Sequence, residues 1–289
     1  MFSPTSITLS TNSHPITLHL FSTGMVADKS KLRTPRWQGP LATIDAIIDP
    51  HFTEWLPIWV MVIEHPEGIF LIDTGERTEV NNKGYFRSSG LLVNRFMTTQ
   101  FKFDITRDQE IDRQLQNLQI PIKKVTAVIL THLHLDHTDG LYHLPATPVY
   151  LHTREWQHPH GALPKLYPPW FKPTLLDLDT SCGPFKKARF LTKERDIALL
   201  HTPGHTYGHC SVLIKTDGAD ILFAGDVCYS ESDLKKENFA ANLVSRRQAK
   251  KTYAAIKAYA RQHPLVFLPT HDPDAGQRLL NSSSFRSAG

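Results

Sequence analysis

The feature that most constrains the fold is a short apolar run that leads directly into a cluster of histidine and aspartate. Residues 127–130 (Ala-Val-Ile-Leu) are followed at 131–140 by Thr-His-Leu-His-Leu-Asp-His-Thr-Asp-Gly. Imidazole nitrogen and carboxylate oxygen are ligands that suit Zn²⁺ and similar metals. One tetrahedral zinc needs fewer ligands than this loop offers, because other parts of a chain normally contribute too. The loop therefore predicts a site for two metals, and the fold must bring further ligands to the end of this strand.

Composition places the chain among ordinary globular proteins. Its 289 residues are 40% hydrophobic and 21% charged, which predicts one domain over residues 1–289. The net charge of +4 is too mild to indicate a nucleic-acid partner. No segment has the roughly 18 apolar residues of a membrane span, and the N-terminus does not resemble a signal peptide. With only three scattered cysteines, these features predict a cytoplasmic protein without a membrane partner.

Short apolar runs recur along the chain and alternate with predicted helices. A capping box at Thr106 and Gln109 predicts one helix, and an amphipathic segment at 242–262 predicts another. Two longer excursions, 25–57 and 76–107, are rich in aromatic residues, and the second suits either a satellite core or a pocket wall. The tail 281–289 is expected to be flexible. This order predicts a layered α/β fold in which helices cover a pair of sheets. Strands are expected near 7–23, 59–63, 69–72, 127–131, 149–151, 190–191, 197–200, 211–214, 221–223 and 265–268.

Polar residues follow the ends of several predicted strands, and strand ends on one rim of a sheet converge in space. Residues i and i+2 of an extended segment point the same way, so His132 and His134 can hold one metal together. Each remaining residue is assigned by its place in the chain. His205 would complete the first metal site, Asp136, His137 and His271 would hold the second metal, Asp226 would bridge the two, and Asp73 and His209 would support the ligands from behind. His158 and His160 have no acidic partner nearby, which indicates a solvent-exposed loop.

The motifs together resemble the metallo-β-lactamase superfamily. The resemblance rests on the histidine loop, Pro203-Gly204-His205-Thr206, Gly225-Asp226 and Thr270-His271, preceded by Leu71-Ile72-Asp73-Thr74-Gly75. These five motifs span residues 71 to 271. The resemblance implies an αββα sandwich, with two mixed β-sheets covered by helices on both outer faces. It also implies a dinuclear site at one edge of the sheets, holding two Zn²⁺ or other divalent metals such as Co, Mn or Fe.

Within that superfamily the chain is most similar to the N-acyl-homoserine lactone lactonases, which act in quorum quenching. The similarity lies in residues 56–59 (Leu-Pro-Ile-Trp), in residues 80–84 (Val-Asn-Asn-Lys-Gly) and in Tyr229, three residues beyond Asp226. It implies a hydrolase that opens a small-molecule lactone by attack of a metal-bridging hydroxide on the carbonyl. Tyr229 would contact that carbonyl, and Asp136 would pass a proton to the leaving oxygen. Leu135 stands where some lactonases carry an aromatic residue, which bears on acyl-chain preference.

The metal motif leaves several alternatives open. Another small-lactone or ester hydrolase, an organophosphate or phosphodiester hydrolase, and a glyoxalase II-like thioesterase would share the same ligands. A flavo-diiron redox protein typically replaces one histidine with an acidic residue, and His134 argues against that class. Besides other hydrolases and redox proteins, a further alternative is a binding module that is stabilised by metal and has no activity. A homodimer is also consistent with the sequence, since residues 37–59 could seal a neighbour's pocket as readily as their own.

Overall fold

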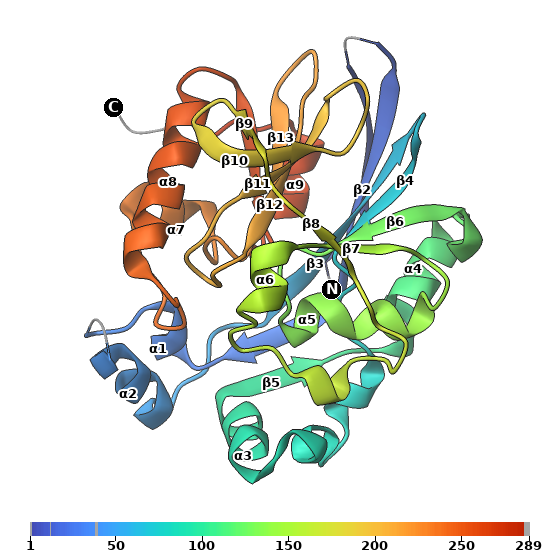
Figure 1. Cartoon of the computed structure of the whole chain (residues 1–289). Helices are drawn as coiled ribbons and strands as arrows, with labels where there is room; N and C mark the ends of the chain where they lie inside the picture. Colours follow the sequence, from blue (N-terminus) through green and yellow to red (C-terminus); the bar gives the residue numbers. More distant parts are fainter. Residues whose placement is uncertain (1, 12, 38–39, 286–289) are drawn as a thin grey trace.

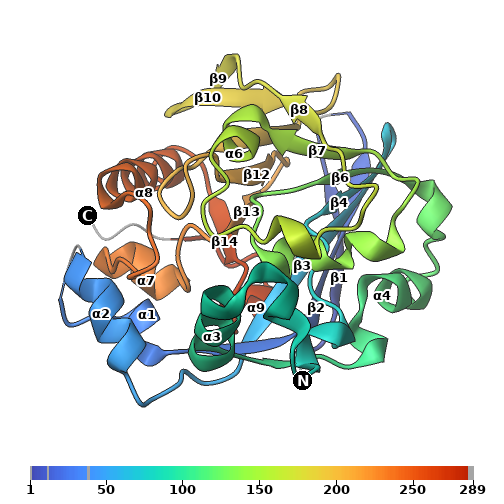
Figure 2. The ribbon, with the colours of Figure 1, turned by 60° about the horizontal axis from the view of Figure 1, so that its bottom comes forward.

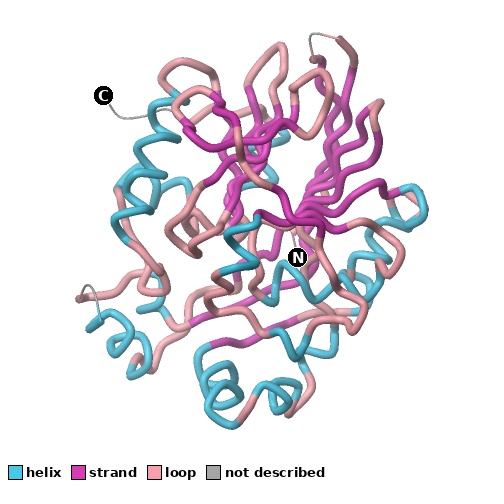
Figure 3. The backbone as a smooth tube through the Cα atoms, viewed as in Figure 1, coloured by secondary structure: helices cyan, strands magenta, loops and turns pink. Residues whose placement is uncertain are grey.

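Two β-sheets pack face to face at the centre of the molecule, and helices lie outside them (Figure 1, Figure 3). The computed structural model describes residues 2–11, 13–37 and 40–285. The first sheet runs in the order β1-β2-β3-β4-β6-β7-β8, with β5 paired to β2, and the second runs β14-β13-β12-β11-β10-β9. Both sheets are mixed, because β4, β6, β7 and β8 pair in parallel in the first and β13 pairs in parallel with β14 in the second.

The strands have the following bounds. In the first sheet they are β1 (Thr5–Ser10), β2 (Pro15–Asp28), β3 (Leu56–His65), β4 (Gly68–Ile72), β5 (Phe101–Asp104), β6 (Val125–Ile129), β7 (Val149–His152) and β8 (Thr174–Leu176). In the second they are β9 (Thr180–Cys182), β10 (Phe185–Phe190), β11 (Ile197–His201), β12 (Cys210–Ile214), β13 (Asp220–Gly225) and β14 (Leu265–Pro269).

Three apolar clusters define the layers of the fold. Trp59 and Met61 of the first sheet pack with Val212 and Phe223 of the second, so one cluster fills the space between the sheets. On the outer face of the first sheet, the cluster includes residues of α4 (Ile111–Asn117). On the outer face of the second sheet, it includes residues of α8 (Arg246–Ala260). Helix, sheet, sheet and helix thus follow one another, which confirms the αββα sandwich.

The remaining helices lie around the two sheets, and the end of the molecule at the bottom of Figure 1, where several of them lie, comes forward in Figure 2. No helix among the described residues combines the length and the apolar character needed to cross a membrane. These remaining helices are α1 (Ser30–Arg33), α2 (Pro40–Ile48), α3 (Leu91–Gln100), α5 (Leu135–Thr138), α6 (Thr153–Gln157), α7 (Glu231–Lys236) and α9 (Ala275–Leu280).

The two excursions and the tail differ in detail from the sequence prediction. The 25–57 segment begins inside β2 and then forms α1 and α2, while the 76–107 segment contains α3 and β5. These short elements have little periodicity of their own, because only part of their apolar residues, among them Met97, Phe101 and Phe103, pack into a cluster, while others such as Leu91 and Leu92 are exposed. Part of the tail predicted to be flexible is packed: Phe285 is buried against Phe267, and its N–H donates to Leu265 O. Residues 286–289 of that tail lie outside the described residues.

Candidate metal centre

The predicted ligands come from loops that leave the ends of β6, β11, β13 and β14. The loop after β6 carries His132, His134, Asp136 and His137, the last two on α5. His205 follows β11, and the backbone turns directly after β13 and β14 to present the two ligands that follow them. The structure brings all seven into two groups that share one aspartate: His132, His134, His205 and Asp226 form the first, and Asp136, His137, Asp226 and His271 form the second.

In the first group, outer hydrogen bonds determine which nitrogen of His132 and of His134 faces the centre. The Thr131 hydroxyl donates to Asp73 and is 3.0 Å from His132 Nδ1, so the ring donates through Nδ1 and keeps a lone pair on Nε2. His134 Nε2 donates to the carbonyl of His160 at 3.0 Å, which frees His134 Nδ1. That Nδ1 lies 2.9 Å from His205 Nε2, so the first group converges on one point.

In the second group, the same logic applies to both imidazoles. His137 Nδ1 donates to Asp73 at 2.7 Å, and His271 Nδ1 donates to the carbonyl of Pro57 at 2.9 Å. Both Nε2 atoms are therefore free to accept a metal. His137 Nε2 lies 3.3 Å from Asp226, and His271 Nε2 lies 3.2 Å from Asp136.

Orphaned atoms test whether these residues suit a metal. His132 Nε2, His137 Nε2 and Asp226 Oδ1 are buried without a hydrogen-bond partner among the described residues. Buried polar atoms rarely stay unpaired, because each costs about 1–3 kcal/mol. Lone pairs that point to a common space, on nitrogen and oxygen donors, fit Zn²⁺ and related divalent ions. We conclude that the donor set fits two divalent cations.

The electrostatics agree with this fit. Burial holds the pKa of His132 and His205 well below the usual histidine value, so these imidazoles are neutral, as metal ligands must be. For His137, burial lowers the pKa but the carboxylates, first of all Asp226, outweigh it and raise the pKa well above the usual value. A group of carboxylates that attracts a proton this strongly also attracts a metal cation.

Asp73 and His209 lie behind the ligands. Asp73 is fully buried, and its carboxylate accepts from Thr131 N, from the Thr131 hydroxyl and from His137 Nδ1. His209 Nε2 accepts the backbone N–H of Asp226 at 3.0 Å, and its Nδ1 donates to Thr202 O at 3.1 Å. Both nitrogens of His209 are thus occupied by the protein, and this ring orients Asp226 instead of facing the centre.

Glu155 is a buried carboxylate for which the sequence contains no signal. It accepts from the backbone N–H of Leu133, between two candidate ligands, and from Thr206 Oγ1 and Gly208 N beside His205. Burial raises its pKa to about 7, against the opposing effect of these hydrogen bonds. The side chain therefore ties the histidine loop to the loop after β11, and only the tertiary fold brings these two loops together.

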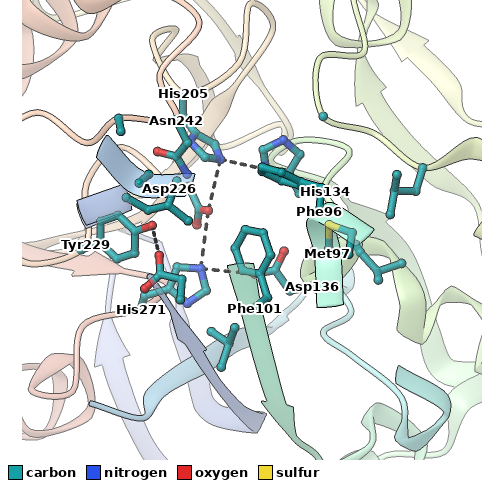
Figure 4. A pocket seen from close by; sticks show the side chains of 18 of the residues that line it. Phe96, Met97, Phe101, His134, Asp136, His205, Asp226, Tyr229, Asn242 and His271 are labelled. Carbon is teal, nitrogen blue, oxygen red and sulfur yellow. Dashed lines mark hydrogen bonds and ion pairs between the residues drawn. The ribbon is translucent and has the colours of Figure 1, made fainter. Parts of the chain in front are cut away.

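Tyr229 lies beside the second group, with its ring centroid 6.0 Å from that of His271 (Figure 4). Its hydroxyl donates to Asp28 at the end of β2, an acceptor that the sequence does not indicate. Burial raises the pKa of Tyr229 well above its usual value, and Asp28 raises it further, so the phenol keeps its proton.

A pocket of about 370 Å³ opens over the two groups (Figure 4). His134, Asp136, His205, Asp226 and His271 lie along its inner wall. His160 also lines the pocket, although the sequence indicates only an exposed loop there. The other walls are largely apolar and come from both aromatic excursions and from the loop after α6, with Ile47, Phe96, Met97, Phe101, Phe103 and Leu163 among the lining residues.

Gly161 gives a test of how closely the first group is held. It has φ +75°, and a Cβ atom built on it would lie 2.3 Å from His134 Nε2. Gly161→Ala should therefore displace His134 and cost about 1–2 kcal/mol in backbone strain. We expect metal affinity at the first group to fall about 10- to 100-fold, measured by metal titration of the apoprotein. Gly218→Ala, where the nearest atom is 3.9 Å away, is the matched control; equal affinity in both variants would contradict the role of Gly161.

The fold and the site together define a metal-dependent hydrolase of the αββα class. The family model of the metallo-beta-lactamase superfamily matches residues 53–271. The chain belongs to the metallo-beta-lactamase superfamily, and this membership implies binding of a divalent metal.

Two curated relatives and one solved structure are similar to this chain. An N-acyl homoserine lactonase of Bacillus sp is 26% identical over 231 residues, covering 78% of this chain and 86% of the relative. The N-acyl homoserine lactonase AttM of Rhizobium radiobacter is 24% identical, covering 80% and 87%. The structure of an N-acyl homoserine lactone hydrolase with N-hexanoyl-L-homoserine at its metal centre superposes with a TM-score of 0.72 at 20% identity, covering 92% and 94%. Its similarity establishes the shared fold.

Proposed function

We propose that the protein is a dinuclear zinc hydrolase that opens the lactone ring of N-acyl-homoserine lactones. The observation that carries this proposal is the pair of His/Asp groups sharing Asp226 at the inner wall of a largely apolar pocket. The apolar walls suit an acyl chain, and the polar inner wall suits a reacting ester. The lactonase relatives named above support the choice of substrate class.

In the proposed reaction, water adds across the ring C–O bond. Two bound divalent metals would lower the pKa of that water and polarise the carbonyl. Asp136 would accept the proton of the water and return it to the ring oxygen that leaves, so that a hydroxy acid is formed. His134, His137 and His271 would keep their orientation throughout, because the outer nitrogen of each ring is already hydrogen-bonded to the protein.

Tyr229 would donate a hydrogen bond from its hydroxyl to the carbonyl oxygen as negative charge develops there. In the structure this hydroxyl donates to Asp28, so donation to a substrate requires the O–H to rotate away from Asp28. Tyr229→Phe should therefore lower kcat by about 10²-fold with both metals retained. The comparison is Tyr142→Phe, which removes a hydroxyl near the surface and should stay within about twofold. Unchanged turnover in Tyr229→Phe would remove this residue from the mechanism.

The substrate class is tested with a panel of acyl-homoserine lactones, γ-lactones, phosphotriesters and thioesters, together with metal analysis. We expect two zinc ions per chain and the highest kcat/KM on the acyl-homoserine lactones. Phosphotriester turnover far above lactone turnover would identify an organophosphate hydrolase instead, and thioester turnover would identify a thioesterase.

The proposal includes association of two copies of the chain. Apolar side chains are exposed on α2, and Leu91 and Leu92 at the start of α3 are 86% and 84% exposed at the same end of the molecule (Figure 2). Exposed apolar patches of this kind mark interaction surfaces. Light scattering should give a mass of about twice the 32.8 kDa of the chain, and Leu92→Glu should shift it toward the monomer. A monomeric mass for the unchanged chain would contradict this part of the proposal.

A further inference from the structure

Asn242 is a polar residue of the pocket that the proposed chemistry does not use. It lies in the loop between α7 and α8, flanked by Ala241 and Leu243, which line the same pocket. Its carboxamide oxygen is buried and accepts no hydrogen bond from any described residue. A buried acceptor without a donor carries a cost, which a native protein retains where a ligand supplies the partner.

Most of the other polar groups of the pocket already have a partner or a role. Five belong to the two metal groups, and Tyr229 and Asp28 are bonded to each other. Glu76 is fully buried and faces Asp139 and Asp136, whose charges add to burial in raising its pKa. The side chain of His160 is exposed. Apart from the metal groups, the described lining residues with buried oxygens that lack a hydrogen-bond partner are thus Glu76 and Asn242, and of these two only Asn242 also lines the small recess beside the metal ligands.

Asn242 is also close to the place where the reaction would occur. A small recess of about 20 Å³ is lined by Asn242 together with His205, Asp226, Tyr229 and His271. Figure 4 shows Asn242 on the same side of the pocket as His205 and Asp226. In an N-acyl-homoserine lactone a single carbon separates the amide nitrogen from the carbonyl carbon that is attacked. A group that recognises this amide must therefore lie beside the metal ligands, and Asn242 does.

The backbone holds this loop in place. Ala241 N donates to Leu32 O at 2.7 Å, which ties the loop to α1. Ser245 N donates to Gly204 O at 3.2 Å, and Val244 N donates to His205 O at 3.4 Å. The carboxamide is thus carried by a segment bonded on both sides, one of them the loop that carries a candidate ligand. Such a preorganised group contributes more to binding than a mobile one.

We propose that Asn242 is a specificity-determining residue whose carboxamide oxygen accepts the N–H of the acyl amide, so that the pocket selects N-acyl lactones over lactones without an amide. The inference rests on the proposed function, because it names the part of that substrate which the pocket recognises. A ligand without the amide would leave the buried oxygen of Asn242 unsatisfied. The loss of such a neutral hydrogen bond corresponds to a decrease of about 5- to 150-fold in binding affinity.

The test compares two substrates that differ only at the amide: N-hexanoyl-homoserine lactone and an α-alkyl-γ-butyrolactone of equal chain length. Asn242→Ala should reduce the ratio of their kcat/KM values about tenfold, through a loss on the amide substrate. Leu243→Ala removes an apolar contact of the same pocket and should lower both values by the same factor, so its ratio stays that of the unchanged protein. Asn242→Gln, which keeps a carboxamide, should recover part of the ratio.

The outcomes separate the two proposals. If the unchanged protein opens both lactones and Asn242→Ala leaves the ratio as it was, the role of Asn242 is overturned and the lactonase function stands. If the unchanged protein opens neither lactone, the proposed function fails and the inference fails with it. Metal content and melting temperature are measured for each variant, and a fallen ratio at full metal content and unchanged melting temperature supports the inference.

Discussion

Replacing Asp226 with alanine should abolish activity, by at least about 10³-fold, because this carboxylate belongs to both metal groups. Its oxygens lie 3.3 Å from His205, 3.3 Å from His137 and 3.5 Å from His271. Without it, each group keeps three of its four donors, and nothing bridges them. We expect the metal content to fall below two per chain, measured by elemental analysis after dialysis against a defined metal concentration.

The comparison for this variant is Asp217→Ala, which removes an exposed carboxylate in the turn between β12 and β13. It should keep both metals and full activity, since surface substitutions seldom change stability by more than about 0.5 kcal/mol. If Asp226→Ala bound two metals and turned over lactone at the rate of Asp217→Ala, the shared position of Asp226 would have no functional meaning.

The structure brings the predicted ligands together because of how they are placed in the chain. His205, Asp226 and His271 each follow the end of an apolar strand or lie in the loop behind it, and the sheets gather these ends at one edge. The alternation of His132 and His134 likewise survives folding, because both rings turn toward the same group. Local pattern and chain order carry this information, so it can be extracted without knowing any long-range contact.

The residues that the sequence did not indicate are those whose role depends on distant partners. Glu155 acts between two loops that are far apart along the chain, and Asp28 receives Tyr229 across 201 positions. Asn242 lies in a segment without periodicity, and only the structure shows that its buried carboxamide oxygen has no hydrogen-bond partner among the described residues. His160 is exposed, as the sequence predicts, but its backbone carbonyl accepts a hydrogen bond from His134 Nε2, and such a contact leaves no trace in residue type. Hydrogen-bond complementarity at this distance is a property of the fold.

Replacing Asp73 with asparagine should lower metal affinity about 10- to 100-fold while leaving the backbone undisturbed. Asp73 has φ +60°, a left-handed conformation that asparagine also tolerates. Its carboxylate accepts three hydrogen bonds, and the amide NH₂ of asparagine would face at least one N–H or O–H donor instead. His137 could then pair with the amide only by moving its proton from Nδ1 to Nε2, and this would remove the lone pair that faces the second group.

A second substitution at the same position distinguishes the effect of the His137 tautomer from the effect of backbone strain. Asp73→Ala leaves the same donors unpaired and adds strain at φ +60°, so it should destabilise the apoprotein more than Asp73→Asn does, by about 1–2 kcal/mol. Urea unfolding gives the stabilities and competitive metal titration gives the affinities. Excess zinc should restore activity to Asp73→Asn, because the other ligands of the second group, Asp136, Asp226 and His271, are unchanged. Wild-type affinity in Asp73→Asn would show that His137 keeps its tautomer without this carboxylate, and that Asp73 serves the turn alone.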